Sequence, residues 1–106
     1  MLSENLLASI PDAALGEVVT SLVSRRGMRI ERIVSQGQAS PDGFWYDQTE
    51  NEFVLLLKGH AELEFQDGHT VTLFPGDWLE IEARVRHRVR STAPDERTVW
   101  LVAFYG

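Results

Sequence analysis

Two segments of the sequence carry side chains that could do chemistry together. Glu52 begins an apolar run that ends at Gly59, and His87 lies further along, in a run where arginine alternates with other residues. A carboxylate and an imidazole are common ligands of divalent cations. They can equally form a charged, hydrogen-bonded pair without a metal ion. Whether the two side chains meet depends on the elements that position them.

The segment that follows Glu52 is predicted to be a strand with two apolar faces. Val54 and Leu56 lie on one face, and Glu52 shares their parity, because successive side chains of a strand point to opposite sides. We therefore expect Glu52 to point into the interior. The opposite face carries Phe53, Leu55 and Leu57. This second apolar face needs a cover, which a second subunit or the N-terminal arm could supply.

The arginine-rich run around His87 has the sharpest alternation in the chain. Val85, His87 and Val89 share one face, so we expect His87 to project into the interior between two valines. The opposite face carries Arg84, Arg86, Arg88 and Arg90. Such a row could bind an anion, but we favour a solvent-facing stripe that pairs across the sheet with Glu62 and Glu64.

Further side chains are candidates for the same site. Tyr46 and Gln48 are two residues apart and would share a face, as a pair of ligands would. Phe44, Trp45 or Trp78 could line a cavity beside the apolar strands. The predicted ligand pocket consists of Tyr46, Gln48, Glu52, Trp78 and His87.

The rest of the chain predicts an all-β fold. Residues 1–16 are expected to form an irregular arm, and residues 17–24 fit either a helix or a strand. We favour a hairpin there, because that segment is rich in β-branched residues and Arg26-Gly27 predicts a turn. Asp67-Gly68 and Pro75-Gly76 predict two more turns. Many short strands with regularly spaced turns are typical of a small antiparallel barrel or sandwich.

Composition limits the classes of function. A length of 106 residues predicts a single domain over 1–106, with an arm and hairpin in 1–27 and a barrel in 28–105. The net charge of -6 argues against a nucleic-acid or anionic-membrane partner. Cysteine is absent, so disulfides and thiolate chemistry are excluded. Without a predicted signal peptide or membrane span, we expect a cytoplasmic protein.

The pattern resembles the cupin family over roughly Met28 to Tyr105. Cupins carry a first motif with a glycine, two histidines one residue apart, a glutamate and a closing glycine. Gly43, Glu52 and Gly59 match that spacing, while Tyr46 and Gln48 occupy the histidine positions. In the second motif Gly76-Asp77 and His87 match. The substituted positions of the second motif are Glu82, Arg84 and Ser91.

The resemblance implies a small jelly-roll barrel and a homodimer. It also implies a single divalent metal, iron, manganese, nickel or zinc, held by Glu52 and His87 with Gln48 as a weaker ligand. The alternative is a metal-free hydrogen-bonded cluster. The implied function is a small-molecule-binding cupin, with metal-dependent dioxygenase, isomerase or lyase chemistry as one reading. Other readings are a non-catalytic, metal-free ligand-binding or sensing dimer, and a barrel kept only for assembly.

Overall fold

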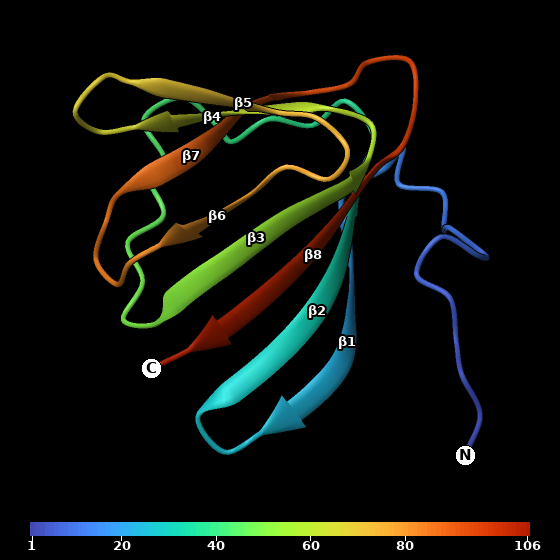
Figure 1. Ribbon diagram of the computed structural model, residues 1–106. Coiled ribbons are helices and arrows are strands. Elements are labelled where there is room, and N and C mark those ends of the chain that lie inside the picture. Colours follow the sequence, from blue (N-terminus) through green and yellow to red (C-terminus); the bar gives the residue numbers. More distant parts are fainter.

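The computed structural model describes all 106 residues and contains eight strands in two antiparallel sheets (Figure 1). The first sheet has the strand order β1-β2-β8-β3-β6 and the second has the order β5-β4-β7. The predicted all-β fold is confirmed, and the two sheets form a jelly roll. The strands are β1 (Val18–Arg25), β2 (Met28–Ser35), β3 (Asn51–Lys58), β4 (Ala61–Phe65), β5 (Thr70–Leu73), β6 (Trp78–Ile81), β7 (His87–Thr92) and β8 (Thr98–Tyr105).

The ambiguous N-terminal segment is a strand, as the β-branched residues favoured. β1 and β2 form an antiparallel hairpin closed by Arg26 and Gly27, and Gly27 has a positive φ of 76° that a tight turn requires. β2 then pairs with β8 along its whole length. The hairpin therefore continues the larger sheet of the barrel. No helix in the structure is long and apolar enough to cross a membrane.

The core lies between the two sheets. In β3 the buried residues are Val54 and Leu56, as the predicted parity required. β8 contributes three large inward side chains, and the shorter sheet closes the core from the opposite side (Figure 1). The buried cluster consists of Val54, Leu56, Ala61, Leu63, Phe65, Leu73, Ile81, Trp100, Val102 and Phe104.

The outer face of β3 is only partly covered. The N-terminal arm places Ala13 against the outer side of the large sheet, where Ile10 and Leu57 pack around a second small core. Phe53 instead stacks against Trp78 of β6, with ring centroids 5.3 Å apart, and Trp78 is 62% exposed. The arm thus covers one end of this face. The homodimer stays a prediction.

The structure corrects the expected alternation around His87. Arg84 has a φ of 68°, in the left-handed region, so the run before His87 is not a strand and β7 begins only at His87. Val85 is consequently 41% exposed instead of buried beside His87. The segment just before β3 forms no strand and makes only one isolated bridge, between Tyr46 and His87.

The arginine stripe divides into two pairs with different partners. Arg88 and Arg90 pair across the sheet with Glu64 and Glu62, at 3.0 and 3.2 Å, as expected. Arg84 and Arg86 lie before β7, and both donate to the carboxylate of Asp47. Each of the four arginines is therefore paired with a carboxylate, and no row of arginines is free to bind an anion.

Candidate functional site

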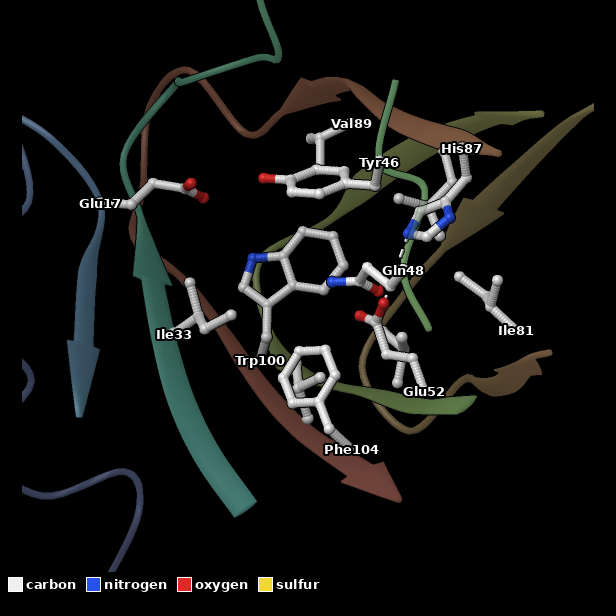
Figure 2. A pocket seen from close by; sticks show the side chains of 13 residues that line it. Glu17, Ile33, Tyr46, Gln48, Glu52, Ile81, His87, Val89, Trp100 and Phe104 are labelled. Carbon is white, nitrogen blue, oxygen red and sulfur yellow. Dashed lines mark ion pairs between the residues drawn. The ribbon is translucent and has the colours of Figure 1, made fainter. Parts of the chain in front are cut away.

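A cavity of about 90 Å³ lies between the two sheets, and Figure 2 shows the side chains that line it. Its walls are mainly apolar. Its polar side chains come from segments that are distant in sequence: Glu17, Tyr46, Gln48, Glu52 and His87. A few convergent polar groups among apolar walls are the usual composition of a small-molecule pocket.

Four of the five predicted pocket residues line this cavity. They are Tyr46, Gln48, Glu52 and His87. Trp78 does not join them, because it pairs with Leu55 in the sheet and shares the outward parity of that residue. The same alternation that points Ile81 inward turns Trp78 to the surface. The prediction that Trp78 lines the pocket was therefore wrong, because Trp78 lies on the outward side of β6.

Glu52 and His87 meet at one end of the cavity. The Nε2 atom of His87 lies 3.3 Å from Oε1 of Glu52, and the two side chains are only 6% and 12% exposed. The other ring nitrogen, Nδ1, lies 2.9 Å from the carbonyl oxygen of Val85. A carbonyl only accepts, so Nδ1 carries a proton and donates it to Val85. The remaining nitrogen, Nε2, then faces the Glu52 carboxylate and donates to it when the ring carries a second proton.

The environment favours the protonated imidazole. Burial, the largest influence, acts to lower the pKa of His87, but the hydrogen bond to Glu52, the hydrogen bond to Val85 and the charge of Glu52 outweigh it. The pKa of His87 is therefore raised above 6.5. The end of the cavity thus favours an imidazolium–carboxylate pair over a neutral imidazole.

This raised pKa predicts a dependence of stability on pH. A group whose pKa is higher in the folded state stabilises the fold fully below its unfolded pKa, here 6.5, and that contribution is lost as the pH rises through the folded value. The free energy of unfolding should thus fall more steeply above that pH in the wild type than in His87→Gln. Urea unfolding at several pH values between roughly 6 and 9 measures the difference. Parallel pH profiles for the two proteins would show that the pair contributes nothing.

The ring of Tyr46 packs against the imidazole of His87. The two rings are stacked with centroids 5.4 Å apart, and the two backbones exchange hydrogen bonds of 2.7 and 3.2 Å. Burial, followed by the charges of Glu17 and Glu52, raises the pKa of the Tyr46 phenol above 10.0. The hydroxyl therefore stays protonated and can donate a hydrogen bond inside the cavity.

Asp47 positions the segment that carries Tyr46 and Gln48. Its Oδ2 atom accepts hydrogen bonds from Arg84 at 3.1 Å and from Arg86 at 3.2 Å. The carbonyl of Gln48 accepts another hydrogen bond, from the backbone N–H of Arg84 at 2.7 Å. Together these contacts fix the loop before β3 to the loop before β7. The sequence offered no signal for Asp47, because its partners lie outside any regular strand.

Glu17 is a second pocket residue that sequence reasoning missed. Its Oε2 atom accepts a hydrogen bond of 2.6 Å from the hydroxyl of Ser35, which in turn accepts one of 3.1 Å from the indole N–H of Trp100. Ser35 is fully buried and Trp100 is only 5% exposed. Glu17 immediately precedes β1, and its place in the cavity follows from the pairing of β1 with β2. No periodicity of its own segment indicates that placement.

The donor set does not fit a resident metal ion. Protein metal sites with open positions usually supply three histidine or carboxylate ligands. Here the structure contains no group of three or more histidine, aspartate or glutamate side chains placed to hold a metal. Tyr46 and Gln48, which occupy the two other expected ligand positions, are weaker donors, and the ring of Tyr46 is stacked on the imidazole.

Two antiparallel sheets that enclose a mainly apolar cavity with a few polar side chains define a small jelly-roll protein. The sequence model of the cupin domain matches residues 32–104 of this chain, so the protein belongs to the cupin family. No match was found among curated proteins.

Similar solved structures support the same fold. A protein of Ralstonia eutropha JMP134, provisionally named a mannose-6-phosphate isomerase, is 42% identical, with a TM-score of 0.94 over 99% of this chain and 98% of its own. A cupin superfamily protein of Desulfitobacterium hafniense DCB-2 is 20% identical, with a TM-score of 0.80 over 99% and 92%. An RmlC-like cupin of Desulfovibrio desulfuricans is 18% identical, with a TM-score of 0.77 over 98% and 96%. The last two similarities concern the fold alone.

Proposed function

We propose that this cupin binds a small organic molecule in the cavity between its sheets, through its own side chains and without a metal ion. The observation that carries the proposal is the buried Glu52–His87 pair at one end of the cavity. A buried ion pair is seldom more stabilising than well-packed apolar residues of similar volume. A charged pair that faces a cavity is more simply explained by a ligand that it contacts.

The size of the cavity limits the ligand. Its volume of about 90 Å³ is smaller than the cavities of ~150 Å³ that are known to hold benzene. A compact molecule of a few non-hydrogen atoms, or one end of a larger molecule, fits this volume. Gln48 and Tyr46 would hydrogen-bond its polar groups, while Trp100 and Phe104 pack against its carbons.

Proton-transfer catalysis is a second candidate function. A carboxylate that shares a proton with an imidazole can remove a proton from one atom of a ligand and return it to another. Isomerisation of a sugar requires such a transfer, and the similar protein of Ralstonia eutropha carries an isomerase name. In this reading Glu52 is the base, which takes the proton, holds it as a carboxylic acid and returns it, while the imidazolium of His87 keeps the Glu52 side chain in place.

Ligand binding can be tested by protein NMR with a panel of small alcohols, amines and sugars. The indole N–H of Trp100 reports on the cavity, because that ring lines it. We expect at least one probe to shift this signal and to lose about tenfold in affinity in Glu52→Gln, since a hydrogen bond to a charged group contributes ~1.5–3 kcal/mol. Glu82→Gln, at an exposed carboxylate outside the cavity, is the control and should bind normally. If no probe shifts Trp100, the proposal fails.

The proposal that the cavity works without a metal ion makes a separate prediction. Elemental analysis of protein purified without chelators should find far less than one equivalent of iron, manganese, nickel or zinc, because only two of the usual donors are present. Dialysis against EDTA should leave the melting temperature unchanged within about 1 °C, since no metal contributes to stability. Stoichiometric metal that is lost in both Glu52→Ala and His87→Ala would contradict this reading.

A further inference from the structure

The cavity has a second polar end that the Glu52–His87 pair does not explain. Figure 2 shows Glu17 opposite His87, with the hydroxyl of Tyr46 directed toward the Glu17 carboxylate. The carboxylate is held by Ser35, whose hydroxyl donates to it at 2.6 Å, and Ser35 is itself fixed by the indole N–H of Trp100. Ser35 is fully buried, so this series of hydrogen bonds holds the Glu17 carboxylate from the protein interior.

This end carries the negative charge of Glu17, an exposed residue that has no cationic side chain beside it. No lysine or arginine lines the cavity, and none lines the adjoining hollow of about 190 Å³ that shares Glu17, Tyr46 and Val89 with it. The only cationic group of the cavity is His87, whose charge is balanced by Glu52. Glu17 forms no ion pair within 4.0 Å of its own. An anionic ligand would therefore meet a carboxylate, with no guanidinium or ammonium to receive it.

We propose that the ligand is a small organic cation, whose ammonium group lies beside the carboxylate of Glu17 and the hydroxyl of Tyr46. This inference rests on the proposed function and names its ligand class. An ammonium at this end can donate to the Glu17 carboxylate and to the hydroxyl oxygen of Tyr46, which is directed toward that carboxylate. A hydroxyl at the other end of such a ligand can reach the Glu52–His87 pair. A phosphate group, by contrast, is recognised by arginine or lysine, which this cavity lacks.

Three probes of similar size and different charge separate the possibilities. Ethanolamine, ethylene glycol and glycolate each carry a hydroxymethyl group, joined to a cationic, a neutral and an anionic partner. Titrations that follow the Trp100 indole signal should give an order of affinity of ethanolamine, then ethylene glycol, then glycolate. We expect ethanolamine to bind at least about tenfold more tightly than ethylene glycol. Its affinity, unlike that of ethylene glycol, should fall as salt is raised.

The variant Glu17→Gln tests the assigned residue, because an amide oxygen can still accept the hydrogen bond of Ser35. It should remove the preference for ethanolamine and change ethylene glycol binding much less, because the neutral probe has no charge to lose a partner. Glu4→Gln, on the exposed arm, is the matched control and should keep the preference. Should Glu17→Gln fold poorly, the salt dependence of the wild type still decides the question.

Glycolate binding as tightly as ethanolamine, or a preference that survives Glu17→Gln, would overturn the inference. If neutral probes bind through Glu52 but charge makes no difference, the proposed function stands and the cationic ligand class falls. If none of the probes binds, both are contradicted.

Discussion

Replacing His87 with alanine should destabilise the protein by about 2–4 kcal/mol, somewhat below the ~3–5 kcal/mol typical of breaking a fully buried pair. The substitution leaves the carboxylate of Glu52, which is 12% exposed, without a partner of opposite charge. It also removes the ring on which Tyr46 stacks. Access of water to the cavity limits the loss. In a domain of this size the melting temperature should fall by roughly 10 °C or more, as calorimetry can measure.

His69→Ala provides the matched control. His69 also pairs with a carboxylate, at 2.5 Å from Asp67, but these side chains are 55% and 70% exposed. Exposed pairs contribute little to stability, so His69→Ala should melt within a few degrees of the wild type. Equal losses in the two variants would mean that the Glu52–His87 pair is no more important to the fold than a surface pair.

Gly59→Ala is expected to have an effect at least as large, of about 3–5 kcal/mol, because it combines a steric clash with backbone strain. Gly59 is buried between β3 and β4 and has a φ of 83°. A Cβ atom at this position would lie 2.8 Å from the Cα atom of Thr98. The clash is with the backbone of β8, so a change of side-chain rotamer cannot relieve it. The expected result is unfolding at low denaturant concentration, or loss of soluble protein.

Gly68→Ala separates these two causes. Gly68 has a φ of 99° in the turn between β4 and β5, and a Cβ atom added there would have no other atom within 4 Å. Only the backbone strain remains, which costs about 1 kcal/mol for a residue forced to a positive φ. A Gly59→Ala variant as stable as Gly68→Ala would show that β8 yields at this point, contrary to its close packing against Gly59.

The parts of the fold that the sequence predicted correctly are those with a strict local period. Glu52, Val54 and Leu56 point inward because a strand alternates, and β3 pairs regularly with β8 from Asn51 to Leu56. Asp67-Gly68 and Arg26-Gly27 lie in turns for an equally local reason, since both glycines adopt positive φ.

The alternation failed where the backbone departs from a strand. Arg84 is a non-glycine residue with positive φ, which no pattern of residue types indicates. Val85 consequently faces solvent, although His87 still points inward, because the strand begins at His87 itself. The prediction that His87 points inward was therefore correct, whereas the prediction that Val85 lies inward beside it was wrong.

The remaining site residues could not be predicted because tertiary pairing alone places them. Asp47 meets Arg84 and Arg86 across two loops, and Glu17 enters the cavity only because β1 pairs with β2. No regular spacing of residues along the chain indicates either contact. The resemblance to cupins gave the positions of Tyr46 and Gln48, but it carried no information about the carboxylate at the opposite end.

The central claim is that Glu52 and His87 form a charged pair inside the cavity. An NMR titration of the His87 ring protons, in the wild type and in Glu52→Gln, tests it most directly. The pair predicts that the pKa of His87 lies above 6.5 in the wild type and falls in Glu52→Gln, because burial then acts with only the Val85 carbonyl opposing it. The same pKa in both proteins would mean that the imidazole does not share its proton with Glu52, and the proposed site would lose its basis.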